Sequence, residues 1–188
     1  MQLRSTTSDW GSVAKVFHWG TAIFIITMLV IGVTMTRFLD GDPPLKFTVY
    51  QLHKSFGFVI LVFSVMRLLW RVSAKETPRA PSGLPLYQRR IAQTVHFLLY
   101  SLLFAMPITG LIAASASPLN VPTVIFGLFT LPRMVGPDAG IAALFQAAHE
   151  WLAWTLIATL ILHFVGAVWH HFVLSDDTLR RMMPRRAG

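Results

Sequence analysis

The sequence predicts an all-α integral membrane protein, a bundle of four transmembrane helices with both termini in the cytoplasm. Hydrophobic residues make up 54% of the 188 positions and charged residues only 13%, and the mean hydropathy is positive, which is outside the range of ordinary soluble domains. The apolar residues lie in four long stretches that charged or proline-rich segments separate. We therefore interpret residues 1–188 as a single membrane domain with helices at about 16–36, 48–70, 91–114 and 148–174.

The first two helices follow from apolar spans of bilayer length. Residues 16–36 carry no charge, and about 20 apolar residues are enough to cross a bilayer. A long polar lead precedes this span and no small-residue cleavage site follows it, so we expect a retained helix and not a signal peptide. The turn-forming run GDPP leads to the second span, in which Lys54 and Arg67 must snorkel to the membrane surface or face protein.

The second half of the chain holds the other two spans and a long apolar connection. Residues 71–90 are basic and rich in proline, which predicts an extended surface loop. In the third span, Pro107 should kink the helix near Gly110, because proline has no amide hydrogen to donate. The connection at 115–148 is too apolar for a solvated loop, so we expect interfacial or re-entrant structure packed over one end of the bundle.

The charges predict the orientation. The N-terminal lead, the second connection with Arg67 just before it, and the C-terminal tail hold twelve of the sixteen Lys and Arg residues against four acids, and the remaining four basic residues are balanced by four acids. By the positive-inside rule both termini are cytoplasmic. The basic surplus then reflects membrane topology and contact with anionic lipid and not nucleic-acid binding, for which no groove-reading motif is present. The chain has no cysteine, so histidine must be the main ligand of any bound metal.

Two histidines lie inside the almost uncharged fourth span. His149 and His163 are fourteen residues apart, so in a helix their rings leave nearly the same face with a rise of about 21 Å between them. Polar groups buried in hydrocarbon are costly without a partner, and ionisable residues within membranes are functional candidates. Two ligand positions at different depths indicate a helix that carries two stacked metal cofactors.

The other spans offer partners at matching depths. His18 begins the first helix and His53 begins the second, so we expect His18 to pair with His163 and His53 to pair with His149, each pair holding one iron. The depths of His53 and His149, on the periplasmic side, match better than those of His18 and His163. On the inner side His163 lies eleven residues from the end of its helix, which leaves His96, at the start of the third helix, as a competing partner.

Other interpretations of the histidines remain open at this point. His170 and His171 have the position of ordinary interfacial polar residues at the end of the fourth span. A metal or proton transporter is an alternative for the whole set, because imidazoles also bind metals and relay protons in membranes. The only carboxylate in the predicted spans, Glu150, sits at a boundary, so none lies within their apolar parts, which argues against a transported divalent ion. Gly57, one turn after His53, would leave room for a flat macrocycle, which favours a cofactor.

Five segments carry a resemblance to a known family: HWG from His18, HKSFG from His53, HFLLYSLLFAMPITGL from His96, the HEWLAW to HFVGAVWHHF helix, and the tail DDTLRRMMPRR. Together they are similar to bacterial cytochrome b561, particularly its superoxide oxidase branch, over nearly all 188 residues. The double-histidine fourth helix with the tail is the most specific part. The resemblance implies two b-type haems, one held by His18 and His163 and the other by His53 and His149.

The resemblance also implies a function and a location. It suggests an oxidoreductase of the bacterial inner membrane that oxidises superoxide at the periplasmic side and reduces ubiquinone near His170 on the cytoplasmic side. His170 follows His163 by seven residues, so it leaves the same helix face about 10.5 Å nearer the cytoplasm, where an imidazole can hydrogen-bond a quinone carbonyl. His171 is rotated by about 100° and should face lipid headgroups or solvent.

The alternative function is a cytochrome b subunit that passes electrons between quinone and a partner dehydrogenase or periplasmic carrier. In both cases the expected cofactors are two haem b groups and ubiquinone. The expected partners are membrane lipid, ubiquinone, superoxide or another small electron donor and, in the alternative, a protein redox partner. No nucleic acid is expected.

Overall fold

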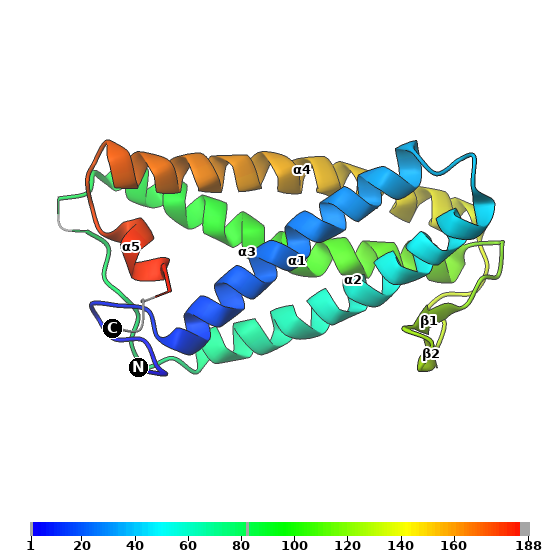
Figure 1. Ribbon diagram of the computed structural model, residues 1–188, viewed down its shortest axis with the longest axis horizontal. Helices are drawn as coiled ribbons and strands as arrows, with labels where there is room; N and C mark the ends of the chain where they lie inside the picture. Colours follow the sequence, from blue (N-terminus) through cyan, green and yellow to red (C-terminus); the bar gives the residue numbers. More distant parts are fainter. Residues whose placement is uncertain (1, 82, 185–188) are drawn as a thin grey trace. The chain divides into compact units, whose positions relative to one another are not determined.

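The computed structural model describes residues 2–81 and 83–184, and it is mostly helical (Figure 1). The elements are α1 (Ser12–Arg37), α2 (Pro43–Val72), α3 (Leu86–Ala116), β1 (Thr123–Ile125), β2 (Phe129–Leu131), α4 (Ala139–Phe172) and α5 (Thr178–Met182). The four long helices are each long and apolar enough to cross a membrane. Many of their large apolar side chains are exposed, as expected for surfaces that face lipid. The predicted all-α membrane fold with four spans is confirmed.

The helices extend past their predicted ends, most of all at the start of α4. This helix begins at Ala139, nine residues before the predicted start. Asp138 precedes it and accepts two hydrogen bonds from the first turn, from the Ile141 amide to its carboxylate and from the Ala142 amide to its carbonyl, both at 2.9 Å. This is an N-cap, and the alanine-rich segment that follows has high helix propensity.

The new boundaries correct one expectation about the histidines. His149 lies ten residues after the first residue of α4, and His53 lies ten residues after the first residue of α2. The prediction that His53 begins the second helix is therefore wrong, and so is the expected position of His149 at the start of the fourth span. His96, which was expected at the start of the third helix, also lies ten residues after the first residue of α3. The start of each strongly apolar run predicted the start of each helix. The turns before these runs, which contain charged and small residues, are also helical.

Residues 115–148 form packed structure, as their apolar composition predicts. Strands β1 and β2 pair antiparallel with Val124 opposite Thr130, and Gly127 at φ 72° helps to close the turn between them. Three hydrogen bonds hold this hairpin on α2. Gln51 Nε2 donates to the Pro122 carbonyl at 3.0 Å, and Ser55 Oγ donates to the Val124 carbonyl at 3.2 Å. Ser55 Oγ also accepts from the Phe126 amide at 3.0 Å.

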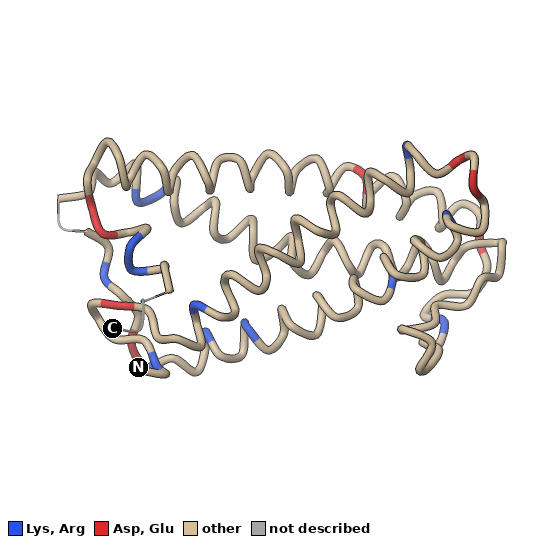
Figure 2. Tube along the Cα trace, viewed as in Figure 1, with Lys and Arg blue, Asp and Glu red and all other residues tan. Residues whose placement is uncertain are grey.

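The chain divides into two compact units. Unit 1 comprises Met1–Gly20, Val65–Ser101 and Leu156–Gly188, and unit 2 comprises Thr21–Ser64 and Leu102–Thr155. The two charge groups of the sequence coincide with these units, because the basic surplus belongs to unit 1 and the balanced charges belong to unit 2 (Figure 2). Arg185 and Arg186, which belong to the basic group, lie outside the described residues.

In unit 1, residues from the N-terminal lead, the α2–α3 connection and α5 are joined by specific contacts. Trp19 Nε1 donates to the carbonyl of Met182 at 2.9 Å. The Arg79 amide donates to the Thr7 carbonyl at 3.0 Å, and Arg181 donates to the Arg79 carbonyl at the same distance. These contacts join the connection to its unit, and most of its described residues are exposed, as expected for a surface loop.

Candidate functional site

Unit 2 brings together His53 from α2 and His149 from α4. Their ring centroids are 6.2 Å apart and their planes are inclined by 80°. Nδ1 of His53 is buried and has no hydrogen-bond partner among the described residues. A buried polar nitrogen without a partner is costly, so the site is built for a further polar or metal contact.

Side-chain and backbone groups of α3 orient His149. Its Nδ1 donates to the Met106 carbonyl at 3.0 Å and also lies 3.2 Å from Oγ1 of Thr109. The Thr109 hydroxyl itself donates to the carbonyls of Ala105 and Met106 at 2.8 and 2.9 Å, which leaves its oxygen to accept. This arrangement places the hydrogen of His149 on Nδ1 and leaves Nε2 free to bind a metal, as in metal sites whose histidine is held by a carbonyl.

Glycines allow the close approach of both rings. A Cβ at Gly110 would lie 3.1 Å from Cε1 and 3.2 Å from Nδ1 of His149, and a Cβ at Gly32 would lie 3.5 Å from Cε1 of His53. At Gly57, which the sequence predicts to leave room for a flat macrocycle, a Cβ would lie at an ordinary contact distance of 3.8 Å from the terminal carbon of Met28 and would not meet the His53 ring. The glycine beside the His53 ring is therefore Gly32 from α1, which no sequence spacing indicated.

Unit 1 brings together three imidazoles. The ring centroid of His163 lies 6.0 Å from that of His18 and 5.1 Å from that of His96. Nδ1 of His96 donates to the Ala92 carbonyl within its own helix at 2.6 Å. The predicted partner and the competing partner of His163 are therefore both neighbours of its ring.

The distances separate the two candidates for His163. An imidazole nitrogen binds a metal ion at about 2 Å, so two imidazoles on opposite faces of one iron have ring centroids about 6 Å apart. The spacings of His18 to His163 and of His53 to His149 fit this value, and the shorter spacing of His96 to His163 does not. With no cysteine in the chain, four neutral imidazoles in two pairs form a donor set that fits two haem b groups.

Arg67 adds a positive charge to the three imidazoles of unit 1. Its guanidinium lies 5.2 Å from the ring centroid of Tyr100, and its charge acts on both His18 and His163. The sequence allowed Arg67 either to snorkel to the membrane surface or to face protein. Its contact with Tyr100 shows that it faces protein.

His170, at the end of α4, pairs with a carboxylate that the sequence analysis did not identify. Its Nδ1 donates to Oδ2 of Asp176 at 2.5 Å, and both side chains are 15% exposed. Burial alone would raise the pKa of Asp176, but hydrogen bonds from Thr178 and His170 outweigh it and hold the pKa below its usual range. The other carboxylate oxygen accepts from the Thr178 amide at 2.8 Å, at the start of α5. In the sequence, the two consecutive aspartates in the tail segment SDD were the feature that could have indicated a carboxylate partner for His170.

His171 is half-exposed at the end of α4. Its Nδ1 is buried without a hydrogen-bond partner among the described residues, and its ring packs edge-on against Phe172 with centroids 4.7 Å apart. The expectation that His171 faces headgroups or solvent therefore stays a prediction for the exposed part of the side chain.

Comparison with known proteins gives consistent results. The sequence pattern of the family described as prokaryotic cytochrome b561 matches residues 9–185. Cytochrome b561 homolog 2 of Escherichia coli K12 is 36% identical, with 100% of this chain and 98% of the relative covered. Probable superoxide oxidase CybB of Yersinia pestis is 30% identical over 91% of this chain and 93% of its own length. Cytochrome b561 homolog 1 of Escherichia coli K12 is 29% identical over 90% and 93%.

Proposed function

The chain belongs to the prokaryotic cytochrome b561 family, and from that premise we propose that it is a di-haem b protein that oxidises superoxide and reduces ubiquinone. Family membership makes it a bacterial membrane protein of electron transport that uses haem b. The observation that carries the proposal of two haems is the presence of two separate histidine pairs with centroid spacings of 6.0 and 6.2 Å. Superoxide as the donor is supported by the name of the 30% identical relative.

Each histidine pair has a defined task in this proposal. His18 and His163 hold one haem, and His53 and His149 hold the other. Haem iron, when bound, supplies a one-electron redox couple in surroundings of low dielectric constant. The Met106 carbonyl keeps the His149 ring in a fixed tautomer and makes its free nitrogen a better ligand.

The spacing of the pairs suits transfer across a membrane. His149 and His163 lie on one continuous helix, and fourteen residues of helix rise by about 21 Å. The basic surplus of unit 1 assigns His18 and His163 to the cytoplasmic side of the bacterial inner membrane, and so assigns the His53 and His149 pair to the periplasmic side.

His170 and Asp176 support quinone reduction on the cytoplasmic side. Two superoxide ions each lose one electron and leave as O₂, and ubiquinone takes up these two electrons with two protons to become ubiquinol. The Asp176 carboxylate accepts the Nδ1 hydrogen of His170, so a proton taken up at Nε2 can be donated to a quinone carbonyl. Asp176 also stabilises the positive charge of a protonated His170, which assists proton transfer to the reduced quinone.

The proposal is tested with purified protein alone, supplied with a superoxide-generating system and a soluble ubiquinone. We expect haem reduction by superoxide and ubiquinol formation without any partner protein. His170→Ala and Asp176→Asn should slow reoxidation by quinone while both haem spectra stay intact. His171→Ala is the matched control and should behave like the wild type.

Two results would contradict parts of the proposal. Unchanged quinone kinetics in His170→Ala, or loss of a haem signal, would remove His170 from the quinone site. Absence of superoxide-dependent reduction in protein with full haem content would favour the alternative, a cytochrome b subunit that serves a partner dehydrogenase or periplasmic carrier. The relative at 36% identity, named only as a cytochrome b561 homolog, is compatible with that alternative.

A further inference from the structure

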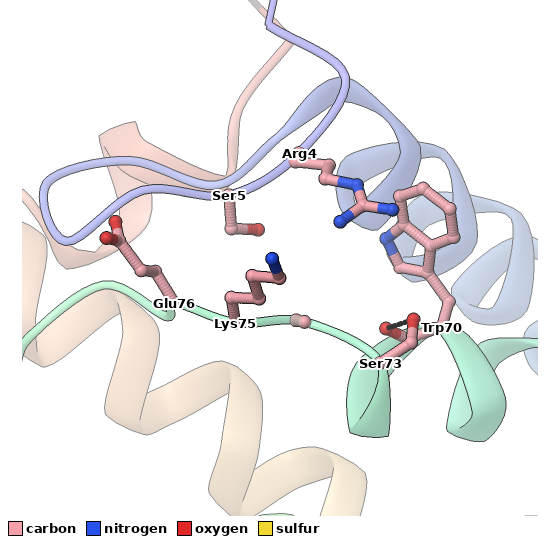
Figure 3. A pocket seen from close by; sticks show the side chains of 7 residues that line it. Arg4, Ser5, Trp70, Ser73, Lys75 and Glu76 are labelled. Carbon is pink, nitrogen blue, oxygen red and sulfur yellow. Dashed lines mark hydrogen bonds between the residues drawn. The ribbon is translucent and has the colours of Figure 1, made fainter.

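Unit 1 contains a pocket that the electron-transfer proposal does not use. It has a volume of about 200 Å³ and lies where α2 ends (Figure 3). The N-terminal lead forms one wall with Arg4 and Ser5, and the end of α2 with the connection after it forms the other. The second wall includes Trp70, Ser73, Lys75 and Glu76.

Hydrogen-bond donors converge in this pocket. Figure 3 shows the guanidinium of Arg4, the ammonium of Lys75 and the hydroxyl of Ser5 directed into the space between the walls, and the Glu76 carboxylate directed away from it. Ser5 Oγ accepts from the Gly11 amide at 3.1 Å, which leaves its hydroxyl hydrogen to donate. In the described part of the chain, no carboxylate forms an ion pair with Arg4 or Lys75. The pocket therefore offers two unneutralised positive charges and a hydroxyl to an anion.

Contacts between the two walls keep the pocket in place. The Arg71 guanidinium, in the last turn of α2, lies 5.0 Å from the ring centroid of Trp10 in the N-terminal lead. The Arg79 amide donates to the Thr7 carbonyl at 3.0 Å, so the connection is also joined to the lead. These contacts hold the two walls together, and the exposed side chains of Arg4 and Lys75 can reach an anion between them.

The surroundings of the pocket select one source of anion. Trp70 lies near the end of a membrane-spanning helix, the level at which tryptophan is enriched at the interface. Leu69 and Val72, on the same final turns, are 64% and 76% exposed, so an apolar surface adjoins the polar pocket. A phospholipid can contact both the polar pocket and the apolar surface, with its phosphate among the donors and its acyl chains along the exposed apolar residues. Inorganic phosphate can contact only the polar pocket.

We propose that this pocket binds the phosphate headgroup of an anionic phospholipid, with Arg4 and Lys75 neutralising its charge and Ser5 donating a hydrogen bond. The basic surplus of unit 1 raises the local concentration of such lipids. The site is independent of the proposed redox activity, since none of its residues contributes to the histidine pairs.

The test counts bound lipid on the full-length protein with its haem, in neutral detergent, by native mass spectrometry. The protein is titrated with dioleoyl phosphatidylglycerol, and separately with dioleoyl phosphatidylcholine and with inorganic phosphate. The pocket variant is Arg4→Gln with Lys75→Gln. The matched control is Arg89→Gln with Arg90→Gln, which removes the same charge from unit 1 outside the pocket.

We expect the pocket variant to bind phosphatidylglycerol about twenty- to thirtyfold more weakly, because each basic residue near an anionic lipid contributes roughly fivefold. The control should change by less than about threefold, and Lys75→Gln alone should show roughly the fivefold loss. Equal weakening in both double variants, or none in the pocket variant, would overturn the site. Displacement of phosphatidylglycerol by inorganic phosphate at equal concentration would overturn the assignment to lipid.

Discussion

The two histidine pairs differ in what surrounds them. In unit 2, His149 is held by the Met106 carbonyl and Thr109 and packs against Gly110, so hydrogen bonds and a missing side chain determine where the ring lies. In unit 1, the ring of His163 is close to a third imidazole, and the charge of Arg67 acts on it. One pair is positioned by hydrogen bonds and a missing side chain, and the other has a third imidazole and a cation nearby.

This difference predicts different sensitivities. A pair defined by packing should lose its cofactor when the space around the ring is filled. A pair with a nearby cation should keep its cofactor when the cation is removed, but its reduction potential should change. The predictions below test this contrast, beginning with the substitutions that remove the ligands themselves.

The largest effect is expected from loss of an axial ligand. Alanine at any of the four paired positions should reduce the haem content from two per protein to one, because a haem with one axial bond is held far less firmly. The haem-to-protein ratio and the reduced-minus-oxidised spectrum measure this loss. The four positions are His18, His163, His53 and His149.

His96→Ala is the control for this experiment, and both haems should remain, because its ring is too close to His163 to serve as the opposite ligand of one iron. Full low-spin haem content in His18→Ala, together with a loss in His96→Ala, would reverse the pairing in unit 1.

The next effect is expected from filling the space beside His149. In Gly110→Ala the new Cβ would lie 3.1 Å from the ring, which must move by a few tenths of an ångström and strain its bond to Met106. Overpacking of this kind costs roughly 1–3 kcal/mol, so binding of the unit 2 haem should weaken by about five- to a hundred-and-fiftyfold. The fraction of haem that the protein retains on dilution measures this weakening.

Gly57→Ala adds the same methyl group to a helix of the same unit and is the matched control. Its Cβ would meet Met28 at an ordinary contact distance of 3.8 Å, and alanine is favoured over glycine within helices. Full retention of the unit 2 haem in both variants would show that the close approach at Gly110 has no functional consequence.

The comparison also shows which features the sequence could predict. The four spans follow from bilayer-length apolar runs, and the pairing of His53 with His149 follows from depth along the helices. The 6.2 Å spacing of the two rings fits that pairing. The start of α4 was missed because the cap of Asp138 and an alanine-rich turn carry little hydrophobic signal. The contact of Gly32 with His53 depends on how two helices pack, which spacing along one helix does not contain.

A smaller effect is expected from removing the cation in unit 1. Arg67→Leu should lower the reduction potential of the haem held by His18 and His163, because a nearby positive charge favours the reduced and less positive iron. We expect a shift on the order of 50 mV, which corresponds to about 1 kcal/mol for one electron. A spectroscopic redox titration resolves the two haems.

Arg67→Lys keeps the charge and should stay closer to the wild-type potential. Two results in Arg67→Leu would contradict this prediction: an equal fall in the reduction potential of the unit 2 haem, or no fall in that of the unit 1 haem. Either would mean that the guanidinium does not act selectively on the unit 1 haem.

The smallest effect is expected at Thr109, whose oxygen lies 3.2 Å from Nδ1 of His149. Thr109→Val keeps the shape of the side chain and removes this acceptor, but the Met106 carbonyl at 3.0 Å remains as the main acceptor. The loss should be at the lower end of a typical hydrogen bond, about 0.5 kcal/mol, which appears as roughly a twofold faster loss of the unit 2 haem. Thr36→Val is the matched control, because the Thr36 hydroxyl donates to the carbonyls of Gly32 and Val33 in the same way that Thr109 donates within α3. Among the described residues Thr36 makes no hydrogen bond to a histidine, so its variant should keep the wild-type rate, and Thr109→Ser should restore that rate. If Thr109→Val instead altered the spectrum of the haem in unit 1, the independence of the two sites on which this comparison rests would be lost.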